Sequence, residues 1–290
     1  MFLTAPDTVV LGLRALSFVV VFQAAGTVIF LRLFESQLVL SAEVIRKLGA
    51  IAAAAGLLLT VIYHFSVPAR LTGTFLGILD PSMQLLLFES NAGVARTVRV
   101  AGLCLLLVAF LKIERFSYAA GLIGVMMVVA SFALMGHTAT HNQRWLMGPL
   151  LIFHLAVVAF WFGAFLPLCL VARSEVISRA GSLIAQFSSV AVWLVPTILV
   201  AGIVMSVFLL PNVESLFTPY GSLILTKVTG FGVLMGLATL NKWRFGPRIC
   251  AGHTASLAVF KRLVMIEWVA VAFLLALTAI MTALFSPAEH

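Results

Sequence analysis

The stretch MGPLLIFHLAVVAFWFGAFLPLCLVA, residues 147–172, decides the fold of this chain. It contains no Asp, Glu, Lys or Arg, and His154 is its most polar side chain. A helix needs about 20 consecutive apolar residues to cross the hydrocarbon core of a bilayer. The stretch meets this length, so we predict that it forms a membrane-spanning helix.

The whole chain has the composition of a protein that crosses the membrane many times. Its 290 residues are 62% hydrophobic and only 10% charged, which is more apolar side chain than a soluble domain can keep away from water. The apolar runs are continuous rather than alternating, which favours helices over a β-barrel. We therefore predict an all-α polytopic membrane helix bundle that forms a single integral membrane domain over residues 1–290. The eight predicted transmembrane helices are 9–33, 44–66, 94–113, 118–136, 147–172, 185–210, 222–241 and 260–284.

The distribution of charge predicts the orientation in the membrane. Most of the 18 Lys and Arg residues lie in the loops that follow the first, third, fifth and seventh spans. Because cytoplasmic loops are enriched in Lys and Arg, both termini are expected outside, which is the periplasm for a bacterial inner membrane. This bias explains the net charge of +8 without a nucleic-acid partner. The N-terminus lacks the features of a cleaved signal peptide, and none is expected.

The two halves of the chain, about 1–136 and 137–290, share a weak pattern. Corresponding spans carry a polar residue followed by a glycine, and a glycine followed by a cation, at matching separations. We interpret the pattern as a possible four-plus-four repeat of two parallel halves, with coincidence among small and apolar residues as the alternative. The matching pairs are Ser17 with Gly26, His154 with Gly163, Gly93 with Arg99, and Gly221 with Lys227.

The longest external connection, residues 67–93, is too apolar for a solvated loop. We expect part of it to lie on the membrane surface or to fold back over the bundle. Near the cytoplasmic end of the last span, Glu267 is expected to form a structural ion pair with Lys242 or Arg244, because an unpaired charge inside a membrane is unfavourable. Trp161 is expected to pack within the bundle.

Arg99 and Lys227 are cations that lie inside predicted spans. They either extend toward the outer headgroups or act on the bundle interior, by holding a carboxylate of an outer loop or by repelling cations. The sequence leaves both interpretations open.

Four histidines are expected at the outer face of the bundle. His137 ends the fourth span, His154 lies about two turns into the fifth span, His64 is in the last turn of the second span, and His141 lies in the loop between the fourth and fifth. Imidazole and the thioether of nearby Met135 are ligands that suit copper, particularly Cu(I). The alternatives are an interfacial position for His64 and simple packing for the methionine. The cysteines form no CxxC pair, so we expect neither a zinc site nor a disulfide framework.

A set of five stretches, most of them in the second half of the chain, carries a resemblance to known proteins. The stretches are GHTATH at 136–141, FHLAVVAFWFGAFLPL at 153–168, FSSVAVWLVPTILVAGIV at 187–204, TPYGSLILTKVTGFGVLMGLATLNKWRFGPRI at 218–249 and RLVMIEWVAVAFLLAL at 262–277. Through them the chain resembles the CopD family, also called PcoD, of bacterial copper-resistance inner-membrane proteins.

The resemblance implies an eight-helix protein of copper resistance or copper uptake that acts with a periplasmic copper-binding partner of the CopC type. It assigns family histidines to His137 and His154. Family members often have a histidine in the first span where this chain has Ser17. If that histidine is a ligand in the family, this site has lost or replaced it, and the candidate substitutes are His64 and His141.

We expect a copper-handling protein of the inner membrane and not an enzyme. Copper, as Cu(I) or Cu(II), would bind His137, His154, His141, His64 and Met135 at the periplasmic face and pass inward. No nucleotide-binding loop supplies energy for the step. One alternative is a haem-binding redox protein that uses His137 and His154 as axial ligands. Another is a copper chaperone or assembly partner that transports nothing.

Overall fold

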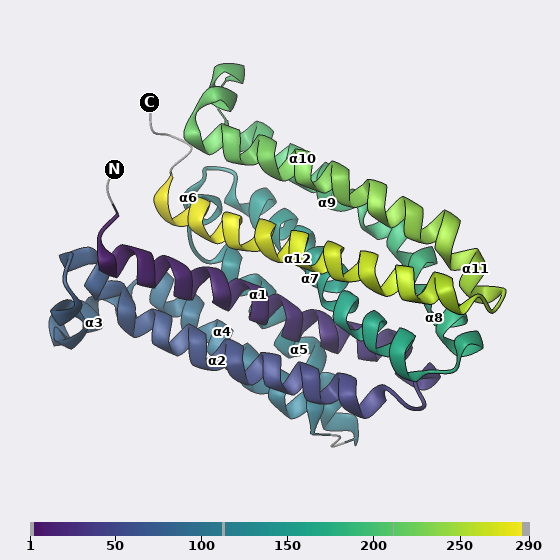
Figure 1. Cartoon of the computed structure of the whole chain (residues 1–290). Helices are drawn as coiled ribbons and strands as arrows, with labels where there is room; N and C mark the ends of the chain where they lie inside the picture. Colours follow the sequence, from purple (N-terminus) through teal and green to yellow (C-terminus); the bar gives the residue numbers. More distant parts are fainter. Residues whose placement is uncertain (1–2, 112–113, 211, 286–290) are drawn as a thin grey trace.

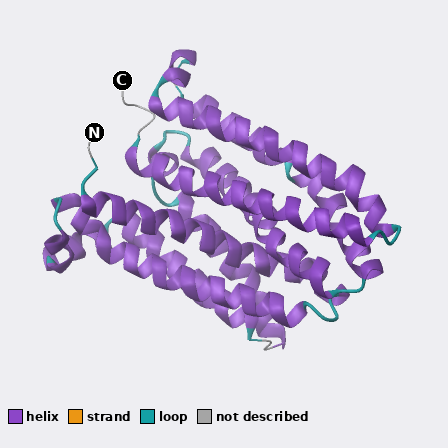
Figure 2. Ribbon diagram, viewed as in Figure 1, coloured by secondary structure: helices purple, strands orange, loops and turns teal. Residues whose placement is uncertain are grey.

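The computed structural model describes residues 3–111, 114–210 and 212–285. Figure 2 shows helices joined by short loops, and this part of the chain contains no strand. Eight helical runs are long and apolar enough to cross a membrane, which confirms the predicted fold class. They are α1 (Ala5–Phe34), α2 (Ala42–Thr72), α4 (Asn91–Phe110), α5 (Glu114–Ala133), α7 (Arg144–Ser174), α8 with α9 (Ile177–Leu194 and Pro196–Leu209), α10 (Pro219–Leu240) with its continuation, and α12 (Thr254–Leu284).

Short helical elements connect the spans. They are η1 (Glu35–Gln37), η2 (Phe75–Leu79), α3 (Pro81–Glu89), α6 (His137–Thr140), η3 (Val213–Phe217), the π-helix η4 (Asn241–Phe245) and α11 (Gly246–Cys250). Both ends of the chain lie at the same end of the bundle, together with α3 and α6 (Figure 1). We call this the terminal end, and the end that holds α11 the opposite end.

Helices α1 and α7 form the centre of the bundle because they cross at glycine. A Cβ added to Gly26 of α1 would lie 2.6 Å from the Gly163 Cα of α7, closer than real side chains come. At the crossing, Gln23 donates from Nε2 to the Gly163 carbonyl at 3.0 Å. Trp268 of α12 donates in turn from Nε1 to Gln23 Oε1 at 2.9 Å. Backbone contact and these two hydrogen bonds therefore hold α1, α7 and α12 together.

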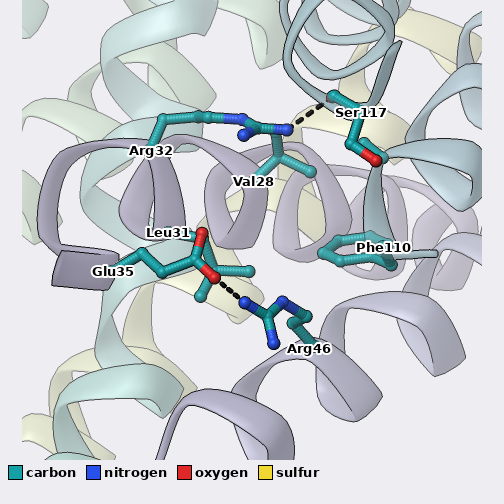
Figure 3. A pocket seen from close by; sticks show the side chains of 8 residues that line it. Val28, Leu31, Arg32, Glu35, Arg46, Phe110 and Ser117 are labelled. Atoms are coloured by element: carbon teal, nitrogen blue, oxygen red, sulfur yellow. Dashed lines mark hydrogen bonds and ion pairs between the residues drawn. The ribbon is translucent and has the colours of Figure 1, made fainter. Parts of the chain in front are cut away.

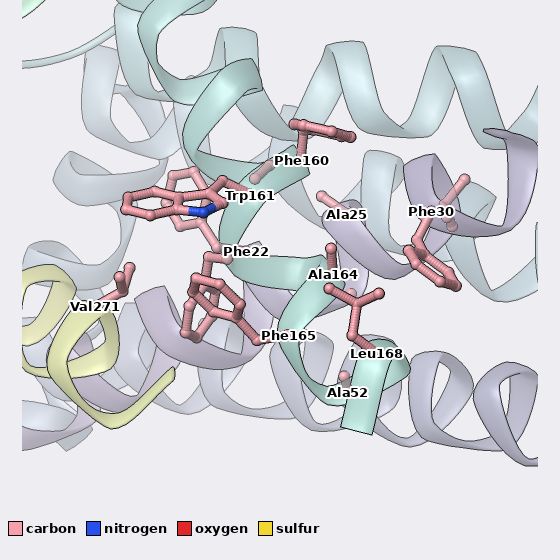
Figure 4. Close-up of a cluster of buried hydrophobic side chains, with 14 of the residues drawn as sticks. Phe22, Ala25, Phe30, Ala52, Phe160, Trp161, Ala164, Phe165, Leu168 and Val271 are labelled. Carbon is pink, nitrogen blue, oxygen red and sulfur yellow. The ribbon is translucent and has the colours of Figure 1, made fainter. Parts of the chain in front are cut away.

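Large aromatic side chains fill the space around this crossing. Figure 4 shows Phe22, Trp161 and Phe165 gathered about the small residues Ala25 and Ala164. The rings of Trp161 and Phe165 are 5.5 Å apart in an edge-to-face arrangement, which is favourable for aromatic pairs. Trp161 is only 4% exposed, which confirms the prediction that it packs within the bundle.

The outer connection folds back as predicted. Helix α2 continues beyond the predicted end of its span to Thr72. The segment then turns, and Gln84 of α3 donates to the carbonyls of Phe65 and Ile78 at 3.1 and 2.9 Å. Figure 1 shows α3 against the terminal end of α2. Residues 67–93 therefore cover that end of the first half.

Two of the predicted spans are not simple helices. The sixth divides into α8 and α9 at Pro196, which has no N–H to continue the helix ladder. The seventh runs from α10 through the π-helix η4 into α11, well beyond the predicted end at residue 241. Both irregular segments lie in the second half, where they face a cavity described below.

Glu175 links the two halves of the chain by hydrogen bonds at the opposite end of the bundle. Its Oε1 accepts hydrogen bonds from the backbone N–H groups of Val39, Leu40 and Ser41 at 2.9–3.0 Å, and from Ser41 Oγ at 2.7 Å. Burial raises the pKa of this carboxyl, but the hydrogen bonds from Ser41, Leu40 and Val39 outweigh it and leave the pKa below its usual value. The end of α7 is thereby joined to the loop before α2.

Candidate metal site

His154 has the geometry of an oriented metal ligand. It lies half-buried on α7, with Nδ1 3.0 Å from the Ile198 carbonyl oxygen of α9. Because a carbonyl oxygen only accepts hydrogen bonds, Nδ1 carries the proton and Nε2 keeps its lone pair. Gly202 gives the ring room, since a Cβ there would lie 3.7 Å from His154 Cε1. A backbone carbonyl that fixes the tautomer is the usual partner of a metal-binding histidine.

The other candidates of the terminal end lie around α6. His137 begins α6, but its side chain lies outside the described part of the structure. His141 accepts at Nδ1 from the Gln143 N–H at 3.1 Å, and its ring is 6.4 Å from that of Phe208. Met135 is partly exposed. His141 and His154 thus both border α9, at the positions of Phe208 and Ile198, which are about 15 Å apart along a helix.

His64 occupies different surroundings. It is 6% exposed on α2, its ring lies 4.2 Å from the Phe88 ring of α3, and neither ring nitrogen has a hydrogen-bond partner. His154 contacts α9 instead. The described residues contain no cluster of three or more His, Cys, Asp or Glu side chains that could hold a metal ion. A shared site for the five candidates stays a prediction, because it also involves the His137 side chain.

Two buried arginines lie on α4, and Arg96 is near enough to His64 to act on it electrostatically. Arg99 is 4% exposed, donates from Nε to Ser131 Oγ at 2.9 Å, and lies 3.8 Å over the Phe132 ring. Arg96 is 5% exposed and donates from Nε to a backbone carbonyl of its own helix. Neither guanidinium forms an ion pair in the described chain. This part of the first half is therefore cationic, which opposes the binding of a metal cation near His64.

Lys227 is the cation that the predicted repeat matches with Arg99. It lies half-buried on α10, near enough to His154 to act on it electrostatically. Its ammonium group makes no ion pair with the described carboxylates, so the outer loops do not neutralise it. A cation at this place weakens the binding of other cations nearby, most strongly those of higher charge.

A cavity at the opposite end of the first half has its charges paired. It has a volume of about 280 Å³ between α1, α2, α4 and α5. Figure 3 shows the Glu35–Arg46 ion pair and Arg32 donating to the Ser117 carbonyl. Both arginines are therefore bound by groups of the chain itself, Arg46 by Glu35 and Arg32 by the Ser117 carbonyl. The sequence contains no periodic signal for these contacts.

A second cavity, of about 210 Å³, lies between α7, α8, α10 and α12. Glu267 and Asn241 form part of its wall, and Asn241 donates from Nδ2 to Glu267 Oε1 at 2.6 Å. The predicted ion pair of Glu267 with Lys242 or Arg244 is wrong, because neither cation comes within ion-pair distance in the described structure. The π-helix that begins at Asn241 turns the amide toward Glu267, which no spacing rule in the sequence indicated.

The comparisons with known proteins match both halves of the chain. The family model described as "Copper resistance protein D-like, N-terminal domain" matches residues 5–147. The model described as "Copper resistance protein D" matches residues 181–281. No curated protein and no solved structure matches.

Proposed function

This chain belongs to the copper resistance protein D family, and we propose that it carries copper across the bacterial inner membrane in support of copper resistance. Copper enters at the terminal end, which we place in the periplasm together with both termini. That orientation rests on the bias of Lys and Arg toward the opposite loops.

The observation that supports a metal site most directly is the contact between His154 and the Ile198 carbonyl. It leaves Nε2 of His154 as a lone-pair donor on a half-buried ring. The remaining ligands are proposed to come from His137 and Met135, which precede α7 and supply an imidazole and a thioether. His141 contacts α9 about 15 Å farther along, at Phe208, so we propose it as an entry ligand and not as a ligand of the same ion. We place His64 outside this site, because its ring packs against Phe88 of α3, whereas His154 contacts α9.

The site takes copper and carries out no chemical conversion, so we propose a carrier and not an enzyme. A periplasmic copper-binding protein of the CopC type is the proposed donor. The haem alternative receives no support from the described residues, since no second axial histidine faces His154 among them.

Binding and transport are tested with the full chain in nanodiscs and in liposomes. Cu(I) affinity is measured by competition with a chromophoric chelator, with His154→Ala and, as the matched control, the exposed His253→Ala. We expect His154→Ala to lose about 10- to 100-fold in affinity and to slow copper entry into liposomes, while His253→Ala changes neither. Full-rate copper entry in His154→Ala would refute the site. A haem absorption band in the purified protein would refute the copper assignment.

A further inference from the structure

Glu267 is a carboxyl group buried inside the bundle without a counter-ion. It is 3% exposed on α12, in the wall of the second cavity. No cation comes within ion-pair distance of it in the described chain. An ionised carboxylate at this depth of a membrane is unfavourable by several kcal/mol, so burial favours the neutral acid.

The hydrogen bonding of Asn241, the partner of Glu267, also indicates a neutral, protonated carboxyl group. Asn241 is 7% exposed and donates from Nδ2 to Glu267 Oε1, but its own Oδ1 is buried without any partner. An ionised Glu267 has only acceptors to offer, whereas a protonated one has an O–H. A carboxylic acid and a primary amide are complementary, because each can donate to the carbonyl oxygen of the other. A proton on Glu267 therefore supplies the donor that Asn241 Oδ1 lacks.

The Glu267 carboxyl and the Asn241 amide border the cavity, together with a few other polar groups. Lys242 of the π-helix lines the same cavity, Ser188 is the hydroxyl that α8 contributes, and Met235 comes from α10. Cys169 of α7 lies close enough to Glu267 to interact with it electrostatically, and Lys261 of α12 interacts in the same way with Cys169. From α1, Gln23 is engaged with Trp268 and brings no charge.

The backbone at Asn241 is also unusual. Asn241 is the first residue of a π-helix, a geometry that occurs mostly as single turns at functional sites. The cavity reaches from there to Trp161 and to the helix break at Pro196. Trp161 lies about 10 Å along α7 from His154, so the cavity and the proposed copper site share one helix.

We propose that Glu267, paired with Asn241, is a proton-binding site and that proton release from it is coupled to copper movement through the second half. Release breaks the O–H bond of the neutral acid, passes the proton to water in the cavity and leaves a carboxylate. The new negative charge favours a copper cation in the same half, and copper in turn favours release, because such coupling is reciprocal. The coupling rests on the proposed function, whereas the proton site does not.

The proton site is tested without copper. Infrared difference spectra of the full chain in nanodiscs are recorded between neutral and strongly alkaline pH, following the carbonyl band of a protonated carboxyl group. We expect the band in the natural chain and in Glu175→Gln, its loss in Glu267→Gln, and a shift in Asn241→Ala, which removes the hydrogen-bond partner. A band that survives in Glu267→Gln, or no band in the natural chain, would overturn the proposal. Unchanged gel-filtration elution shows that each variant is folded.

The coupling is tested by counting protons. Cu(I) is added to protein in weak buffer with a pH indicator, and we expect Glu267→Gln to release about one proton fewer per copper than the natural chain. Equal release would overturn the coupling. If the natural chain binds no copper, the proposed function fails, and the infrared result still decides the proton site.

Discussion

Helices α7 and α10 belong to the same half of the chain, and both are apolar enough to cross a membrane. In the span that α7 forms, 67% of the most apolar 18-residue segment is buried inside the protein. In the span that begins with α10, only 11% of the corresponding segment is buried. Figure 1 shows α7 within the bundle and α10 along its edge. Hydrophobicity alone therefore does not decide which helix becomes central. In a bilayer the lipid is as apolar as the core, and close backbone approach makes the difference.

The largest difference in stability is expected between alanine variants of a glycine in α7 and a glycine in α10. A Cβ on Gly163 has no space against the backbone of α1, while Gly232 has nothing within 4 Å. We expect Gly163→Ala to destabilise the protein by about 3 kcal/mol, because helices α1 and α7 must separate. Gly232→Ala should be neutral or stabilise by up to about 1 kcal/mol, since alanine favours the helix. Unfolding in detergent by denaturant titration measures both, and equal effects would contradict the comparison.

The second-largest difference in stability is expected between variants of a central and an exposed tryptophan, Trp268 and Trp243. Trp268 stacks on Phe162 and donates to Gln23 at the centre, whereas Trp243 is 69% exposed. Trp268→Phe removes the donor and leaves Gln23 Oε1 buried, so we expect a loss of about 1–3 kcal/mol. Trp243→Phe should change stability by less than about 0.5 kcal/mol. Thermal unfolding of the two variants in the same detergent provides the check.

A third prediction separates function from stability at the edge of the bundle. Gly202→Leu on α9 places a side chain against the His154 ring, and α9 is loosely packed enough to accommodate it. We expect copper affinity to fall about tenfold, equivalent to about 1.4 kcal/mol, with little change in unfolding. Gly236→Leu, on the open face of α10, is the control and should leave copper affinity unchanged. A large loss of stability in Gly202→Leu would show that α9 is part of the core.

The smallest effect on stability depends on pH and is expected at Glu175, at the opposite end of the bundle. The pKa of Glu175 is lower in the folded protein than its usual value, so its contribution is present above the unfolded pKa of about 4.3. It is lost as the pH falls through the folded pKa, because the protonated carboxyl accepts the four hydrogen bonds more weakly. We expect about 1 kcal/mol less stability at acidic pH. Glu175→Gln should be less stable at neutral pH and should lack this pH dependence.

Much of the fold could be predicted because apolar length is a strong signal. All eight spans were found, but their ends were not. Hydropathy reports the thickness of the hydrocarbon, whereas a helix continues into the headgroups as long as its backbone hydrogen bonds do, as α2 does to Thr72. The division at Pro196 was missed because a proline within an apolar run is tolerated in membrane helices.

The candidate site could be predicted only in part. Positions along the spans predict the height of His64 and His154 in the bundle, but not the side of the bundle on which each lies. Helices that are apolar on every face carry little periodicity to indicate it. The partner of His154 is the backbone carbonyl of Ile198, and the partner of Glu267 is an amide presented by a π-helix. Neither contact has a signature in residue types or spacing.

Three arginines of the first half, of which Arg96 and Arg99 are buried and Arg14 is half-buried, have a further consequence for cation leakage across the membrane. Arg14, Arg96 and Arg99 interact electrostatically with one another inside a medium of low dielectric constant. Sodium ions and protons driven inward by the membrane potential meet repulsion there. We therefore expect the first half to resist a leak of cations beside the proposed carrier.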